Sequence, residues 1–215
     1  MKIVSIETGI LNTPLLTPFK TAVRRVDAMT DVLVRITDGD GRMGWGSAPP
    51  TGKVTGDTAG AILGAVDEHL RPALLGRDGE DLNGNLDVVE AALVGNSSAK
   101  AALDIALHDL WAKTLGQPVW KLLGGSGADV ETDVTISVNP PEEMARDALG
   151  AVKRGFKCLK TKVGVGAEID FARLKAIREA VGPEPRIRID ANQGWEPAEA
   201  VRVLNQIGRA SCRER

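Results

Sequence analysis

The second half of the chain repeats a strand-then-helix pattern three times, and this repeat limits the possible folds more than any other feature of the sequence. Alternating apolar residues predict strands over residues 131–138, 157–163 and 186–190. Predicted helices follow them over 141–153, over 167–181 and from about Pro197. Because each helix carries the chain back across the sheet, strands repeated at about 27-residue spacing pair in parallel. This pattern is compatible with an open doubly wound sheet and with a (β/α)₈ barrel.

The two faces of each predicted strand differ in polarity. One face would pack against helices and carries Val134, Ile136, Val138, Leu159, Thr161, Val163, Ile187 and Ile189. The other face carries Thr135, Ser137, Cys158, Lys160, Lys162, Arg188 and Asp190. Helices cover both faces of a doubly wound sheet, so both faces should be apolar there. Polar residues on one face, toward the carboxyl ends of the strands, favour a barrel, and three strands are too few to close one.

The first half of the chain predicts antiparallel strands followed by helices. The strands are expected over 2–13, 31–37 and 43–47, with a hairpin turn at Asp38-Gly39-Asp40-Gly41. The helices are expected from a cap at Asp57 or Thr58 to about Arg71, over 87–94, and from a cap at Ser97 or Ser98 to Leu115. A run of strands and then a run of helices is typical of an α+β domain.

The fold class expected from both halves is α/β: an N-terminal α+β domain, then the first part of a (β/α)₈ TIM-like barrel. That the α+β domain is a capping domain of the barrel is implied only by the family resemblance described below. We place the α+β domain at residues 1–125 and the first three β/α units of the barrel at 126–206. Over 207–215 the apolar helix pattern stops and arginines accumulate. We interpret these last residues as a tail that is foreign to the protein.

The composition excludes several classes of function. A net charge of -2 gives no basic patch for nucleic acid. No apolar run approaches the ~20 residues that cross a bilayer, and Glu7 interrupts any signal-peptide core, so no membrane partner is expected. Two cysteines, Cys158 and Cys212, form no disulfide framework, which favours a reducing, cytoplasmic location.

The strongest chemical signal is a pair of lysines followed by an aspartate. Lys160 and Lys162 are two residues apart on one predicted strand, so their amines point the same way. Asp190 ends the next predicted strand, where a carboxylate can help to hold a divalent cation. A lysine tuned by burial and by neighbouring charges can act as a general base. Together these groups suit the removal of a proton next to a carboxylate and the stabilisation of the resulting enolate.

Simpler interpretations of the same residues stay open at this point. Lys160 and Lys162 are compatible with two surface lysines on an edge strand, although Leu159 and Val163 predict burial of the opposite face. One carboxylate is not a metal site, and Asp190 is equally compatible with a cap of the turn that follows its strand.

Five short motifs make the chain resemble the enolase superfamily in its mandelate racemase/muconate-lactonizing branch, and within that branch the dipeptide epimerases. They are Pro18-Phe19-Lys20-Thr21-Ala22, Gly44-Trp45-Gly46, Thr55-Gly56-Asp57, Lys160-Thr161-Lys162-Val163-Gly164 and Asp190-Ala191-Asn192-Gln193-Gly194-Trp195. The resemblance extends from residue 1 to about residue 206. It is carried most specifically by the lysine pair and the Asp-Ala-Asn-Gln string.

The resemblance implies roles for individual residues. Lys162 would take the α-proton on one face of the substrate, and Lys160 would contact the substrate carboxylate and make Lys162 a better base. Asp190 would be the first of three Mg²⁺ ligands. Arg24 would bind a substrate carboxylate, and Thr135 would also contact the substrate. Arg24 is also compatible with a solvated charge beside Arg25, and Thr135 with a β-branched strand former.

The function implied by the resemblance is that of a Mg²⁺-dependent isomerase, an epimerase of dipeptides such as Ala-Glu. A muconate-type cycloisomerase or an acid-sugar dehydratase is the alternative within the superfamily. The implied partners are a small-molecule dipeptide and, for the full-length protein, further copies of itself. The resemblance also implies two further acidic ligands and a second lysine that these residues do not supply. We therefore expect the chain by itself to bind Mg²⁺ weakly and to be inactive. The alternative from another class of function is a non-catalytic fragment that serves only as a packing or oligomerisation module.

Overall fold

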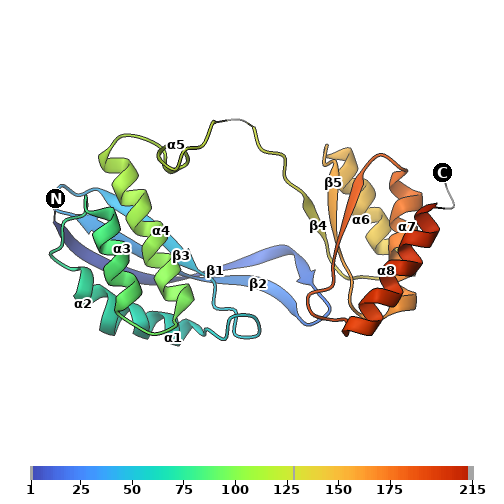
Figure 1. The fold of residues 1–215 in the computed structure, drawn as a ribbon, viewed down its shortest axis with the longest axis horizontal. Helices are drawn as coiled ribbons and strands as arrows, with labels where there is room; N and C mark the ends of the chain where they lie inside the picture. Colours follow the sequence, from blue (N-terminus) through green and yellow to red (C-terminus); the bar gives the residue numbers. More distant parts are fainter. Residues whose placement is uncertain (1, 128, 213–215) are drawn as a thin grey trace. The chain divides into compact units, whose positions relative to one another are not determined.

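The structure is a computed structural model that describes residues 2–127 and 129–212, and it forms two compact units (Figure 1). The first unit comprises Met1–Pro14 and Ala28–Asp129. The second comprises Leu15–Asp27 and Val130–Arg215. The sequence prediction assigned all of residues 1–125 to one domain. Residues 15–27 belong with the second unit instead, because Val138 N–H donates to the Lys20 carbonyl at 3.1 Å.

The sheet of the first unit has the strand order β1-β2-β3. Its strands are β1 (Ile3–Lys20), β2 (Arg25–Asp38) and β3 (Met43–Ala48), and β2 and β3 pair antiparallel. The turn between β2 and β3 forms where predicted, and the Asp38 carboxylate accepts from the N–H groups of Asp40 and Arg42. The predicted ends of the first two strands, at 13 and 31, were wrong. Residues 9–20 contain no buried position, so the apolar alternation that predicts a strand is missing there.

The helices of the first unit are α1 (Ala59–Gly64), the π-helical turn η1 (Ala65–Leu70), α2 (Arg71–Leu74), α3 (Leu82–Ala91), α4 (Ser97–Thr114) and α5 (Val119–Leu122). Of these, α4 packs against β3, and α5 packs against α4. Thr58 caps α1 as predicted, because its Oγ1 accepts from Ala61 N–H at 3.2 Å. The cap of α4 is Asn96 in the left-handed region, not Ser97 or Ser98.

Helix α4 approaches β3 more closely than side chains would permit. A Cβ at Gly44 would lie 2.1 Å from the Ala106 carbonyl oxygen, and one at Gly46 would lie 2.0 Å from that of Ala102. The two glycines therefore let the helix backbone pack directly on the strand. The core beneath includes Val32, Val34 and Ile36 of β2, as the predicted alternation required.

The second unit contains the three predicted β/α repeats. Its strands are β4 (Val134–Ile136), β5 (Cys158–Lys162) and β6 (Arg186–Asp190), in that order and parallel. Its helices are α6 (Pro141–Lys153), α7 (Ala167–Val181) and α8 (Pro197–Cys212). Only β4 is clearly shorter than predicted. Helix α8 continues past residue 206, whereas residues 213–215 of the predicted tail lie outside the described part of the chain.

The predicted polarity of the two strand faces is confirmed. Ile136 and Leu159 form an apolar core with Met144, Ala148 and Ile177 from α6 and α7. The opposite face keeps its charged residues, and the α+β unit followed by the start of a parallel barrel is the fold class that the sequence predicted. None of the helices within residues 2–127 and 129–212 is long and apolar enough to cross a membrane.

Candidate active site

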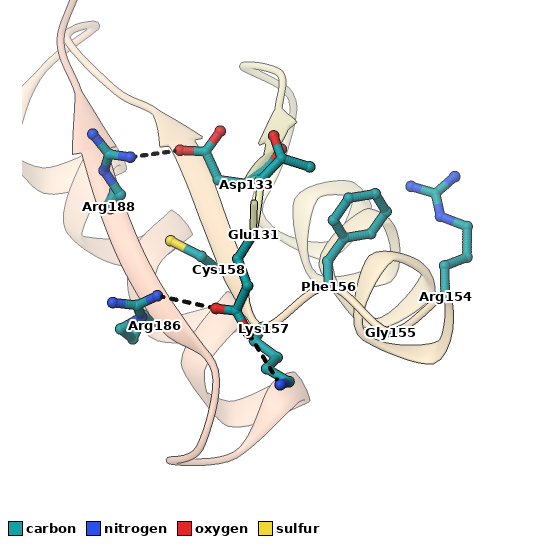
Figure 2. A pocket seen from close by; sticks show the side chains of 10 residues that line it. Glu131, Asp133, Arg154, Gly155, Phe156, Lys157, Cys158, Arg186 and Arg188 are labelled. Carbon is teal, nitrogen blue, oxygen red and sulfur yellow. Dashed lines mark hydrogen bonds and ion pairs between the residues drawn. The ribbon is translucent and has the colours of Figure 1, made fainter. Parts of the chain in front are cut away.

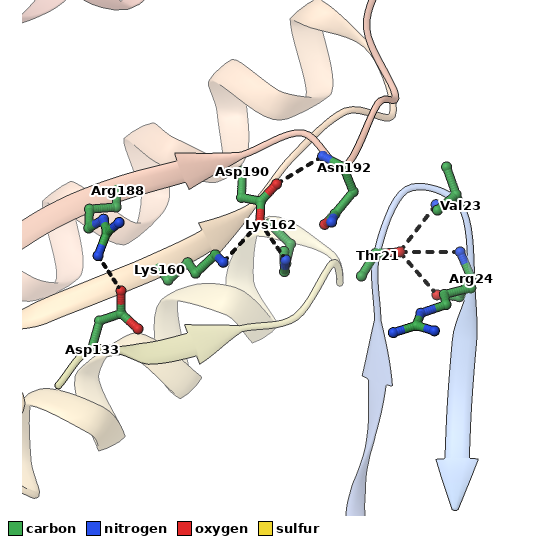
Figure 3. A network of polar contacts seen from close by, with 9 residues as sticks. All are labelled: Thr21, Val23, Arg24, Asp133, Lys160, Lys162, Arg188, Asp190 and Asn192. Atoms are coloured by element: carbon green, nitrogen blue, oxygen red, sulfur yellow. Dashed lines mark hydrogen bonds and ion pairs between the residues drawn. The ribbon is translucent and has the colours of Figure 1, made fainter. Parts of the chain in front are cut away.

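Two lysines and an aspartate meet at the carboxyl ends of β5 and β6 (Figure 3). Lys162 and Asp190 are register partners on the two parallel strands. The Lys162 Nζ lies 2.7 Å from Asp190 Oδ2, and the Lys160 Nζ lies 3.0 Å from the same oxygen. The Lys162 side chain is 6% exposed, whereas that of Lys160 is 35% exposed. The surface-lysine interpretation is therefore wrong for Lys162, which is buried with its charge compensated.

The two lysines keep the Asp190 carboxylate ionised. Its hydrogen bond from Lys162 is the largest cause of a pKa far below the ordinary value for an aspartate. Partial burial opposes this lowering of the pKa, while Lys160 and the Asn192 N–H support it. A carboxylate that stays charged at neutral pH and faces the end of a sheet can bind a cation or orient an ammonium group.

An aromatic ring covers Lys162 from the hairpin side. The Lys162 Nζ lies 5.7 Å from the centroid of the Phe19 ring, at a distance that permits a cation–π interaction. Sequence reasoning used Phe19 only as part of a motif and gave it no role. The contact joins residues that are far apart in the chain, and no local pattern could have indicated it.

The hairpin tip that carries Arg24 is a tight turn, and the hairpin is hydrogen-bonded to the segment that follows β4. Thr21 Oγ1 accepts from the N–H groups of Val23 and Arg24, and Thr21 N–H donates to the Arg24 carbonyl at 2.9 Å. Next to it, Lys20 Nζ donates to Asn139 Oδ1 at 2.6 Å. Arg24 is half-buried, and its guanidinium has no hydrogen-bond or ion-pair partner among the described residues. A charged group in this state is available for a ligand.

Thr135 lies beside the lysines along the sheet. It is the register partner of Lys160 across β4 and β5, so both side chains share the polar face. It is half-buried. Thr135, Lys160, Lys162 and Asp190 are thus brought to one face of one sheet, as predicted, whereas Arg24 stands on the hairpin.

The residues at this site supply only part of a metal centre. Asp190 offers a carboxylate, and the Oδ1 of Asn192, two residues later, is buried without a hydrogen-bond partner. Oxygen atoms of both kinds are ligands that Mg²⁺ accepts. Within the described part of the chain, no group of three or more His, Cys, Asp or Glu could hold a metal. The donor chemistry of Asp190 and Asn192 is therefore of a kind that fits Mg²⁺.

A separate cavity lies at the opposite ends of the same strands (Figure 2). It has a volume of about 360 Å³ and is bordered by Cys158 and Arg186, which begin β5 and β6. Most of its charged side chains are paired, Arg188 with Asp133 at 2.9 Å and Lys157 with Glu131 at 3.1 Å, while the Arg154 guanidinium lies over the Phe156 ring. Because the active sites of barrels lie at the carboxyl ends of their strands, we assign no catalytic role to this cavity.

Comparisons with known proteins agree with this geometry. Residues 5–124 match the family described as mandelate racemase / muconate lactonizing enzyme, N-terminal domain, and residues 143–212 match enolase C-terminal domain-like proteins. An L-Ala-D/L-Glu epimerase from Clostridium acetobutylicum is 51% identical over 207 residues, which cover 96% of this chain and 58% of that protein.

Solved structures give the same picture. The substrate-liganded L-Ala-D/L-Glu epimerase from Bacillus subtilis superposes with a TM-score of 0.94 at 47% identity, covering 98% of this chain and 59% of that one. A dipeptide epimerase from Cytophaga hutchinsonii, complexed with Mg and D-Ala-L-Val, has a TM-score of 0.91 at 35% identity, covering 97% and 57%. The chain therefore spans somewhat more than half the length of the relatives it matches.

Proposed function

Since the chain belongs to the mandelate racemase / muconate lactonizing enzyme family, we propose that it supplies part of the active site of a Mg²⁺-dependent dipeptide epimerase of the Ala-Glu type. The names of its relatives from Clostridium acetobutylicum and Bacillus subtilis support this substrate class. Dipeptides also occupy related structures from Cytophaga hutchinsonii and Enterococcus faecalis.

One observation carries the proposal: Lys162 is buried, ion-paired with Asp190 and flanked by Lys160. A buried amine close to a second amine is the arrangement in which a lysine can serve as a base near neutral pH. The amine is held at the carboxyl end of a parallel strand, where barrel enzymes place their catalytic groups.

Each residue of the site has a distinct task in this proposal. Lys162 Nζ, once deprotonated, takes the α-proton of the dipeptide's second residue. Lys160 keeps its positive charge and binds the carboxylate next to that carbon. Arg24, whose guanidinium has no partner among the described residues, binds the side-chain carboxylate of a Glu-containing substrate. Thr135 contacts the substrate from β4.

Asp190 is the residue that would hold Mg²⁺, with Asn192 Oδ1 as a further oxygen nearby. When bound, the ion supplies Lewis-acid stabilisation of the negative charge that develops on the substrate carboxylate. In this proposal the Phe19 ring, whose centroid lies 5.7 Å from the Lys162 Nζ, also limits the access of water to that amine. A site that excludes water in this way strengthens the interaction of both lysines with the substrate.

The test is exchange of the substrate α-proton with D₂O. Residues 1–206 would be fused to the part of the Clostridium acetobutylicum relative that this chain does not span, and incubated with L-Ala-L-Glu and Mg²⁺. We expect deuterium at the glutamate α-carbon, loss of epimerisation in Lys162→Gln, and normal exchange and epimerisation in Lys175→Gln, an exposed lysine of α7.

Other outcomes separate the alternatives. A folded fusion that converts muconate or an acid sugar but leaves the dipeptide unlabelled would favour the cycloisomerase or dehydratase alternative. A folded fusion that is inactive on every substrate, beside an active Clostridium enzyme, would contradict a catalytic role for these residues.

A further inference from the structure

The second unit contains a buried carboxylate that takes no part in the proposed chemistry. Asp170, in the first turn of α7, has no solvent exposure. Its Oδ2 accepts three backbone N–H groups and one indole N–H, from Gly164 at 2.7 Å, Val165 at 3.1 Å, Gly166 at 3.2 Å and Trp195 Nε1 at 3.1 Å. Its Oδ1 accepts from Arg173 NH1 at 2.9 Å.

The five donors around Asp170 indicate that its carboxylate stabilises the local structure. A buried charge is costly unless it is paired and hydrogen-bonded, and Asp170 is both. Three consecutive N–H groups form a concave anion-binding nest, which in many proteins receives a ligand. Here the nest is filled by a carboxylate of the same chain. The loop after β5 is therefore wrapped around Asp170, and the loop after β6 is joined to the same oxygen through Trp195.

The backbones of the two loops also touch directly. Gly164 has a φ of +105°, and a Cβ there would lie 2.3 Å from the Ala191 carbonyl oxygen. A Cβ at Gly194 would lie 2.3 Å from the Gly164 carbonyl oxygen. The loops are thus packed at a separation that only glycine permits.

A second chain of bonds leads from Asp170 to the hairpin. Arg173, its ion-pair partner, donates from Nε to the Asn139 carbonyl at 2.9 Å. The Asn139 Oδ1 then accepts from Lys20 Nζ at 2.6 Å, beside the Phe19 ring that covers Lys162. Asp170 is therefore connected to three segments that border the site: the two strand-end loops and the hairpin tip.

We propose that Asp170 is a positioning residue, which fixes the carboxyl ends of β5 and β6 so that Lys162 and Asp190 stay in contact. Neither Asp170 nor its partners touch the reacting atoms in the proposed function. The consequence for catalysis rests on that function, but the positioning itself does not. A neutral residue cannot replace Asp170, because asparagine offers one oxygen and turns its amide N–H groups toward donors.

The test measures the accessibility of Lys162 directly. The chain would be treated briefly with an amine-acylating reagent, and labelling rates at individual lysines would be read by mass spectrometry. In Asp170→Asn we expect the rate at Lys162 to rise about tenfold, which corresponds to ~1.4 kcal/mol of lost protection. Lys153 at the end of α6 and Lys175, an exposed residue of α7, should keep their rates, because they lie on helices and not in the two loops.

Two further variants make the result specific. Asp38→Asn removes another buried carboxylate that accepts backbone N–H groups, but in the first unit, so it controls for general destabilisation. Trp195→Phe keeps the aromatic volume and deletes only the indole bond to Asp170. We expect faster labelling of Lys162 in Trp195→Phe and no change in Asp38→Asn.

The outcomes decide the proposal without substrate or metal. Faster labelling of Lys162 in both Asp170→Asn and Trp195→Phe supports positioning. If either folded variant loses thermal stability yet labels Lys162 at the normal rate, Asp170 merely stabilises the unit and the proposal is overturned. If Asp170→Asn does not fold, Trp195→Phe alone decides. Failure of the D₂O exchange experiment would leave this result unaffected, so the two proposals can fail separately.

Discussion

Lys162 and Asp190 are register partners on adjacent parallel strands, and their charged atoms lie 2.7 Å apart. The pair is asymmetric, because the Lys162 side chain is almost fully enclosed, whereas the Asp190 side chain is 27% exposed and also forms an ion pair with Lys160. An enclosed amine beside an accessible carboxylate can give each residue a separate role. The carboxylate can be shared with a cation from outside, whereas the amine can reach only what enters the site.

The ion pairs of Asp190 with Lys162 and Lys160 should make the free energy of unfolding depend on pH. Folding lowers the Asp190 pKa, so its contribution is complete above the unfolded value of about 3.9 and is lost as the pH falls toward the lower folded value. Without added metal, Asp190→Asn should cost about 2 kcal/mol of unfolding free energy at pH 7. In urea unfolding, the difference in unfolding free energy between the unsubstituted chain and Asp190→Asn should shrink below about pH 4. A difference that is constant from pH 7 to pH 3 would contradict the assignment.

Gly164→Ala should be strongly destabilising. The substitution places a Cβ 2.3 Å from the Ala191 carbonyl oxygen, at a φ of +105°. Gly155→Ala is the matched control, because Gly155 has a φ of +96° but open space around it. The control should cost about 1–3 kcal/mol for backbone strain alone, and Gly164→Ala clearly more, in urea unfolding monitored by circular dichroism. Equal losses in the two variants would mean that the loops do not touch.

The Phe19 ring should be energetically coupled to the Lys162 ammonium. A double-mutant cycle of Phe19→Leu and Lys162→Met removes the packing changes of each single variant from the result. We expect a coupling of about 0.5–2 kcal/mol in unfolding free energy. Additive effects of the two substitutions would show that the 5.7 Å contact contributes nothing.

Mg²⁺ should bind this chain only weakly, because no group of three or more His, Cys, Asp or Glu among the described residues could hold a metal. Isothermal calorimetry should give a dissociation constant well above ~1 μM, since tight sites for such hard cations use several oxygen ligands. Asp190→Asn should abolish the binding, and Asp133→Asn, at the other end of the strands, should leave it unchanged. Micromolar binding would contradict this account of the site.

Strand polarity made much of the second unit predictable from sequence. The period-two placement of Lys160, Lys162 and Asp190 against Leu159 and Ile187 fixes which face meets the helices. The hairpin extension and Phe19 were not predictable in the same way, because they depend on contacts between distant segments. Asp170 resembles an ordinary acidic residue near a helix N-terminus, and only the structure shows five donors converging on it.

The most direct test of the central claim, that Lys162 is the base for one face of the substrate, compares two epimers. Inversion needs proton removal on one face and return on the other, so the fusion must draw a second base from outside these residues. In Lys162→Gln we expect α-proton exchange with D₂O to disappear for one of L-Ala-L-Glu and L-Ala-D-Glu and to persist for the other, with no epimerisation. Equal exchange of both epimers, or equal loss, would contradict the assignment of Lys162 as a one-face base.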